Sequence, residues 1–364
     1  MSKDKSKKVL FVDFLRVLAC IIVICCHCKF CLPGSNNTIS KIFLACITAD
    51  GVAIFWMIMG MFYFRDIPYK VRLKKLFKRV VIPIIIISVF IFYFNDYLLG
   101  NKSLLGSIQH PLNDYIDLIR NNILVWEPLI DVGHLWYLYV YILLVLLFPI
   151  LNKIREYIDT IDYKKVLIFF YILLLFNDIS LNKLFLFSFH AFNGVFASLA
   201  CFYTGYILHK NDDKLDNKSL IKYFLIFVFV NLIRMIFTYI VMKGDPSNRE
   251  LLKWYSSFGL IVVICLYMIT RNIFIRINVN KISEKILLHF SKLTFYIYLV
   301  HCTVIRIIDS RGINIFLLQK FNNHVVYFCV YTLIVFIISF IISEFILLLI
   351  RLYNKLFSKR KKKI

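Results

Sequence analysis

The segment VICCHCKFC, residues 23–31, places four cysteines around one histidine, a set of side chains that zinc prefers as ligands. A zinc knuckle also requires a turn that brings its ligands back to one ion. If the segment is helical, it offers only pairs three or four residues apart, such as His27 with Cys31. We therefore expect no metal site here and interpret the cysteines as small buried apolar residues. A redox pair of Cys28 and Cys31 is also disfavoured, because the C-terminal end of a helix destabilises a thiolate.

The spacing of His27 from Arg16 makes this histidine a candidate functional residue. Arg16 precedes it by eleven residues in VDFLRVLACIIVICCH. Eleven helical residues turn through about 1100°, so both side chains lie on one face, about 16 Å apart along the axis. Asp13 lies three residues before Arg16 and can pair with its guanidinium. Inside a membrane an arginine costs at least about 2.5 kcal/mol, so this face is a candidate functional site. The simpler interpretation is that Arg16 pairs only with Asp13 or extends to the headgroups.

The composition of the chain indicates whether these residues lie in water or in a lipid bilayer. Hydrophobic residues make up 60% of the 364-residue chain and charged residues 18%, whereas soluble domains average about 45–50% and 25%. Apolar stretches of roughly 20 residues, enough to cross about 30 Å of hydrocarbon, recur along the chain. We predict an all-α polytopic membrane protein, a bundle of about ten transmembrane helices, at 9–31, 41–64, 80–99, 133–151, 165–181, 189–209, 220–241, 255–275, 287–309 and 324–352.

We expect one integral membrane domain over residues 1–364, with a basic N-terminus at 1–8 and a basic tail at 353–364. No signal peptide is expected, because the first apolar stretch is too long and lacks a small-residue cleavage site.

The basic residues predict the orientation, because Lys and Arg are retained on the cytoplasmic side. With the N-terminus inside, the inner segments hold about 30 of the 44 Lys and Arg and the outer loops about 10, so both termini are predicted to be cytoplasmic. The net charge of +23 lies mainly at the mouths of apolar helices, where topology and anionic lipids account for it, so we expect no nucleic-acid partner. The inner segment 65–79 holds seven bases, more than topology requires, which leaves room for an anionic ligand.

Three histidines from three predicted helices fall in the outer half of the membrane. His27 is joined by His134, which opens the fourth helix together with Trp136, and by His301 of the ninth helix, which lies slightly outside the membrane midplane. The ordinary interpretation is that His134 is a boundary residue and that Trp136, like Tyr296 and Tyr298, is a packing or interfacial aromatic.

Five motifs follow one another along the chain: Arg16 with His27, GVAIFWMIMGMF at 51–62, KKLFKRVVIP at 74–83, HLWYL at 134–138 and YIYLVH at 296–301. In this order they resemble the acyltransferase-3 family of integral membrane acyltransferases, whose first helix carries an arginine, ten intervening residues and a histidine. Two departures stand out. Met59 precedes Gly60 where the family commonly has serine, and we expect no fused soluble hydrolase-like domain after the last helix.

The resemblance implies transfer of an acyl group, usually acetyl, from cytoplasmic acyl-CoA to a hydroxyl of a surface polysaccharide or lipid-linked glycan in the bacterial cytoplasmic (inner) membrane. The inner bases suit a donor with an anionic nucleotide end, because they form charge-assisted hydrogen bonds to phosphates. The pantetheine arm is comparable in length to the 16 Å or so between Arg16 and His27. The residues expected to bind acyl-CoA are Arg16, Arg72, Lys75 and Arg79.

The reaction needs a base for the sugar hydroxyl, and histidine typically contributes about 10²–10⁴ in rate. We assign His27 to this role. The candidate hydrogen-bond donors to the developing oxyanion are His301, Tyr298 and Trp136. The predicted catalytic residues are thus His27, Arg16 and His301, and the predicted substrate-binding residues are His134, Trp136 and Tyr298. No metal is expected to take part.

Several alternatives stay open from the sequence. Transfer through acyl-histidine, or through acyl-cysteine at Cys26 or Cys28, competes with direct transfer. A glycan transporter or flippase is the competing function, although the inverted repeats and broken helices of many transporters are not evident. Besides acyl-CoA, the glycan acceptor and membrane lipids, the further partners considered are a second copy of the chain and the machinery of envelope-glycan synthesis.

Overall fold

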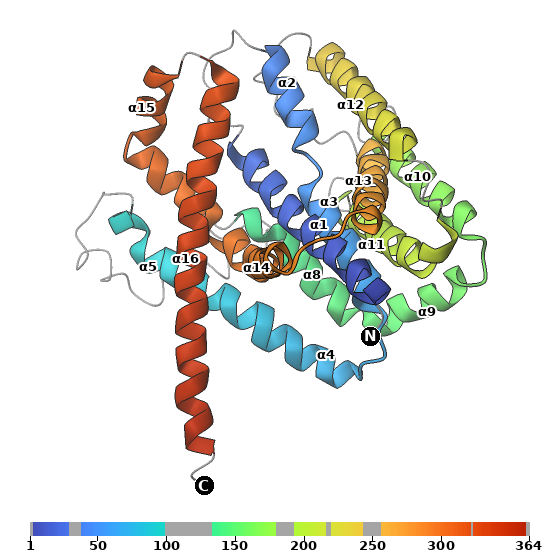
Figure 1. The fold of residues 1–364 in the computed structure, drawn as a ribbon, viewed down its shortest axis with the longest axis horizontal. Coiled ribbons are helices and arrows are strands. Elements are labelled where there is room, and N and C mark those ends of the chain that lie inside the picture. Colours follow the sequence, from blue (N-terminus) through green and yellow to red (C-terminus); the bar gives the residue numbers. More distant parts are fainter. Residues whose placement is uncertain are drawn as a thin grey trace.

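The computed structural model describes residues 3–28, 38–98, 133–179, 193–215, 220–242, 256–321 and 323–361. These residues form helices joined by turns, and they contain no strand, which confirms the predicted all-α class. Figure 1 shows α1 (Lys3–Cys28) passing through the middle of the bundle, while α16 (His324–Lys361) extends well beyond the other helices at its C-terminal end. The helices that surround α1 are α3 (Gly51–Tyr63), α13 (Ser256–Arg276), α14 (Lys281–Ser310) and α16.

Six helices of the described part are long and apolar enough to cross a membrane, and a seventh span results if one bent pair is counted. The predicted multi-pass membrane protein is therefore confirmed, whereas the predicted count of ten spans is not. The other predicted stretches do contain apolar helices, but these are shorter or more polar over their described lengths: α5 (Ile82–Leu98), α10 (Tyr163–Ile179) and α11 (Asn193–Lys210).

One predicted span is not a straight helix. Over 133–151 the chain forms α8 (Trp136–Leu146) and the start of α9 (Phe148–Ile158), and the two axes differ by 75°. Pro149 lies in the first turn of α9, where its missing N–H is tolerated, but a helix continuing from α8 would lose a hydrogen bond and clash with the proline ring. The prediction of one continuous helix here was wrong for this reason.

Close backbone packing joins α3 to α11. A Cβ added to Gly60 would lie 1.7 Å from the carbonyl oxygen of Phe202, and one added to Gly205 would lie 1.9 Å from that of Met57. Small residues allow two membrane helices to approach at this distance. The glycine in the segment GVAIFWMIMGMF is thus required by helix packing.

The basic segment 65–79, which we predicted on the inner side, is helical from Tyr69 on and contains one widened turn. α4 (Tyr69–Leu76) continues through a π-helical turn (Phe77–Val81) into α5. Pro83 explains the widened turn, because it cannot donate to the carbonyl of Arg79 and its ring displaces that carbonyl. Lys78 and Arg79 lie on this turn, and both side chains are exposed.

The membrane-embedded part contains buried ion pairs that the sequence reasoning did not predict. Arg234 of α12 (Leu220–Met242) is fully buried and forms two hydrogen bonds, of 2.7 and 2.8 Å, with the carboxylate of Asp50. Arg271 of α13 pairs with Asp212 and also donates to its carbonyl oxygen at 2.6 Å. These two buried arginines thus each have an acidic partner, as the high cost of an isolated charge in the bilayer requires.

Candidate functional site

Three histidines converge at one end of α1. His27 lies in the last turn of α1, His134 lies in a 3₁₀ turn (Gly133–Leu135) that leads into α8, and His301 lies in α14. The ring centroids of His27 and His301 are 5.1 Å apart, those of His134 and His301 are 5.0 Å apart, and those of His27 and His134 are 6.3 Å apart. The structure therefore brings together the three histidines that the sequence only placed at a similar depth.

Hydrogen bonds to the backbone fix two of these rings. His301 is fully buried, and its Nδ1 lies 2.8 Å from the carbonyl oxygen of Tyr298, which accepts a hydrogen bond from an N–H group only. Nδ1 of His301 therefore carries the proton, and in the neutral ring the lone pair is on Nε2. The Tyr298 hydroxyl donates to the His134 carbonyl, and the His134 Nε2 lies 3.4 Å from the Leu299 carbonyl oxygen, so the 3₁₀ turn is anchored to α14.

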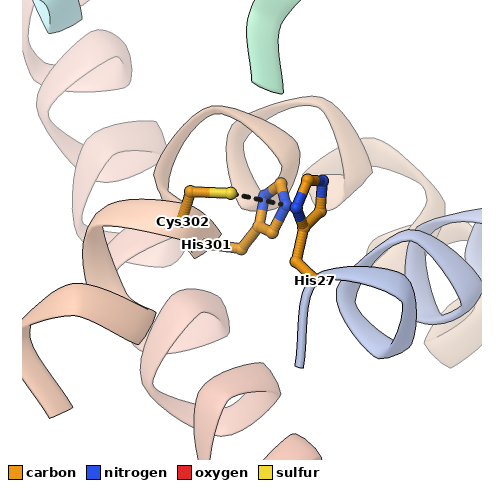
Figure 2. Close-up of side chains that lie close together, drawn as sticks. All are labelled: His27, His301 and Cys302. Carbon is orange, nitrogen blue, oxygen red and sulfur yellow. Dashed lines mark hydrogen bonds between the residues drawn. The ribbon is translucent and has the colours of Figure 1, made fainter. Parts of the chain in front are cut away.

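Cys302 completes the cluster. Figure 2 shows the ring of His27, from α1, beside that of His301, while the sulfur of Cys302 points to the His301 ring. The Sγ of Cys302 lies 3.4 Å from His301 Nε2, and one ligand atom from each of the three residues lies within 4.8 Å of the others. His27 and Cys302 are half-buried, whereas His301 is buried. The cysteine beside His27 therefore comes from α14; Cys31, which the zinc-knuckle interpretation paired with His27, lies outside the described residues.

Arg16 is held on the same helix face by a network of polar side chains. Its Nη1 lies 2.7 Å from the Asp13 carboxylate, as the i, i+3 spacing predicted, and the same carboxylate oxygen accepts a hydrogen bond of 2.6 Å from Ser291 of α14. The side chain of Arg16 is one-third exposed, with its guanidinium 5.9 Å from the Phe62 ring. Asp13 thus orients the Arg16 guanidinium without fully enclosing it, so the remaining N–H groups of the guanidinium are accessible to a ligand.

Aromatic side chains pack next to the histidine cluster. Tyr298 is 5.9 Å from His134 and 5.7 Å from Tyr137, measured between ring centroids. Trp136 is exposed and lies edge-on to Trp56 at 5.5 Å. Aromatic side chains of α3, α8 and α14 therefore pack next to the histidine cluster, where they offer apolar contact surface to a ligand of low charge.

The predicted donor-binding bases fall into two groups. Arg72 donates to the carbonyls of Tyr63 and Ile67, at 2.6 and 3.1 Å, and to that of Arg65, so it holds the turn between α3 and α4. Partial burial lowers the pKa of Arg72, while Tyr63 and Tyr141 act in the opposite direction.

Lys75 and Arg79 are exposed instead. The N–H groups of these two bases are accessible to an anionic ligand, whereas three of the five N–H groups of Arg72 already donate to backbone carbonyls. Whether any of them binds a phosphate stays a prediction.

Trp56 was missed by the sequence reasoning. It is buried, with 3% of its surface exposed, and its indole N–H has no hydrogen-bond acceptor among the described residues. An unsatisfied buried donor costs about 1–3 kcal/mol, and in native structures such groups call for an explanation, of which a missing ligand is one. The resemblance of segment 51–62 to a family motif was the only signal that pointed to this tryptophan.

Fold and site together define a polytopic α-helical membrane protein with a buried histidine cluster at one end of its central helix and an arginine three turns away. The sequence model described as an acyltransferase domain, that of the acyltransferase-3 family, matches residues 9–344. The chain belongs to this family and is a membrane acyltransferase. Searches of curated proteins and of solved structures gave no match.

Proposed function

We propose that the protein transfers an acyl group, most simply acetyl, from acyl-CoA on the cytoplasmic side to a hydroxyl of a surface polysaccharide or lipid-linked glycan, in the bacterial cytoplasmic membrane. The observation that carries the proposal is the meeting of His27, His134 and His301 at one end of α1, on the face that bears Arg16. The two ends of this face are about 16 Å apart, a distance suited to an extended pantetheine arm.

His27 acts as the general base in this proposal. Its ring lies beside His301 and His134 and is half-buried, so an acceptor hydroxyl can reach it while water is partly excluded. As the hydroxyl oxygen bonds to the thioester carbonyl carbon, His27 takes its proton and the carbonyl oxygen becomes negative. Collapse of the intermediate breaks the carbon–sulfur bond, and the CoA thiolate leaves and takes the proton from the imidazolium of His27, which restores the base.

The negative oxygen of the intermediate needs hydrogen-bond donors. The Nδ1–H of His301 and the hydroxyl of Tyr298 are directed to backbone carbonyls, so these two residues position the cluster. Trp56 has a buried N–H with no acceptor among the described residues. We assign this N–H as a hydrogen-bond donor to the carbonyl groups of bound acyl-CoA. Trp136 is exposed and lies edge-on to Trp56, and we assign it, together with His134, to binding of the glycan acceptor.

The anionic end of the donor is assigned to the bases at the inner side. Arg16 supplies the N–H groups that do not bind Asp13. Lys75 supplies an exposed charge on α4, and Arg79 supplies one on the widened turn. Arg72 contributes indirectly, because its hydrogen bonds fix the turn from which α4 begins. Charge-assisted hydrogen bonds of this kind suit phosphate oxygens.

The decisive experiment measures the transfer of radiolabelled acetyl from acetyl-CoA to cell-surface glycan, in membranes that carry wild-type protein or His27→Ala at matched levels. We expect labelled glycan with the wild type and a loss of at least about 100-fold with the variant, the lower range of a general base. His324→Ala, which removes a histidine at the start of α16, is the matched control and should transfer normally. Equal transfer by His27→Ala would refute the assignment of the base. If no protein transferred label while glycan export depended on the chain, a transporter would replace the enzyme.

A further inference from the structure

A second chemical property of the histidine cluster follows from the position of Cys302. His27, His301 and Cys302 supply two imidazoles and one thiol from two helices that pack against each other. Imidazole nitrogen and thiolate sulfur are the ligands most characteristic of zinc, and a three-ligand site leaves a fourth position for water. We propose that these three residues bind a zinc ion and that the bound ion inhibits acyl transfer.

The distances permit such a site after small rotations of the side chains. Three atoms within 4.8 Å of one another share a point no farther than 4.8/√3, or about 2.8 Å, from each of them. Zinc requires about 2.0–2.1 Å to nitrogen and 2.3 Å to sulfur, so each ligand atom has to move by less than about 1 Å. The pair of Cys302 Sγ and His301 Nε2, 3.4 Å apart, already has the spacing of two neighbouring ligands in a tetrahedral site.

The hydrogen bonds of the free protein prepare the ligands. Because Nδ1 of His301 donates to the Tyr298 carbonyl oxygen, the Nε2 lone pair is directed to the centre of the cluster. A backbone carbonyl behind a ligating histidine is a common arrangement in metal sites, where it fixes the ring and raises its basicity. His27 and Cys302 are half-buried, so an ion has access to the cluster from their side.

Inhibition follows from the ligand set, and this part of the inference rests on the proposed function. A ring nitrogen of His27 that binds zinc has no lone pair left to accept the proton of a hydroxyl. Zinc and the acceptor therefore compete for the same group. The metal binding itself does not depend on acyl transfer, so it is tested without acyl-CoA.

The test uses the purified full-length protein in detergent, stripped of metal. Titration calorimetry with zinc chloride is expected to show one ion per chain in the wild type. Cys302→Ala and Cys302→Ser should each weaken binding at least about tenfold, since even substitutions behind a metal ligand cost 10–100-fold. Cys329→Ala, which removes an exposed thiol of α16, is the matched control and should bind as the wild type does. Equal zinc affinity in the Cys302 variants and the wild type would overturn the site.

Cobalt provides a readout that does not depend on any variant folding. Bound to the wild type, Co²⁺ should give visible bands of tetrahedral intensity together with a thiolate-to-metal charge-transfer band in the near ultraviolet. Absence of the charge-transfer band would exclude a cysteine ligand and refute the assignment.

In the transfer assay, zinc should inhibit the wild type and inhibit Cys302→Ala only at concentrations at least about tenfold higher. Identical zinc sensitivity of the two proteins would separate inhibition from this site. Loss of transfer in all proteins would count against the proposed function and leave the binding results intact.

Discussion

Substitution of Asp50 by Asn tests whether the buried ion pair with Arg234 holds the helices that position His27. The guanidinium of Arg234 is 0% exposed and binds both carboxylate oxygens, at 2.7 and 2.8 Å, and its Nη1 also donates to the Cys46 carbonyl at 2.9 Å. Asparagine keeps the shape of the aspartate but removes its charge. The arginine charge is then buried without its counter-ion.

The magnitude follows from the burial of the pair. Removing one partner of a buried ion pair costs about 3–5 kcal/mol, because the remaining charge is left uncompensated. Gly259 of α13 closes the site, since a Cβ there would lie 2.6 Å from Oδ1 of Asp50, so the packing leaves little room for a water molecule to replace the carboxylate. At about 2 °C per kcal/mol, the lower end of the range for medium-sized domains, the melting temperature should fall by about 6–10 °C.

The same substitution should disturb the active-site end of α1. Asp50 directly precedes α3, and at the next residue, Gly51, an added Cβ would lie 2.9 Å from the Ala19 carbonyl oxygen. The beginning of α3 is thus in close contact with α1, about two turns before His27. We expect acyl transfer by Asp50→Asn to fall together with its melting temperature.

The assay is thermal unfolding of purified protein in detergent, with transfer activity measured in parallel. The control is the double variant Asp50→Asn with Arg234→Met, which removes both charges and enlarges neither side chain. Such replacements are often neutral or stabilising, so the double variant should be more stable than Asp50→Asn. If Asp50→Asn costs less than about 1 kcal/mol, or if the double variant is less stable still, the ion pair does not have the proposed role.

Four further predictions concern the site and its support. Arg16→Ala should raise the KM for acyl-CoA by about 10- to 100-fold, the value of a charge-assisted hydrogen bond, whereas Arg16→Lys should recover part of the loss; unchanged steady-state kinetics would contradict donor binding. Trp56→Phe keeps an aromatic ring without the N–H group and should weaken donor use by about 2- to 10-fold at unchanged melting temperature, and a large loss of stability would instead assign the tryptophan to packing. Gly60→Ala should lower stability by at least about 1–3 kcal/mol, because the new Cβ would lie 1.7 Å from the Phe202 carbonyl oxygen; unaltered unfolding would refute the close packing of α3 and α11. Chelation of metal by EDTA should leave transfer intact, and a loss that added zinc restores would show that the reaction needs the metal.

Helical geometry made one face of the site predictable from the sequence. Within a single helix the positions of side chains follow from 3.6 residues per turn, so the common face of Arg16 and His27 and the pairing of Arg16 with Asp13 could be derived. The ion pair of 2.7 Å confirms the second point. The bend within 133–151 also had a signal, Pro149, which the hydrophobic pattern alone concealed.

The sequence by itself therefore determined the all-α membrane class, the approximate positions of the apolar helices and the polar face of α1, because these depend on composition and on local geometry. Only the tertiary structure decided which faces meet. Hydrophobicity gives the depth of His134 and His301 in the bilayer but not the rotation of their helices toward His27, and it could not show that Cys302 would be the neighbouring thiol. Likewise, Arg234 and Asp50 are 184 residues apart, and no local rule joins two charges over that separation. Such pairs form because an unpaired charge in hydrocarbon is costly, and the packing of helices selects the partner.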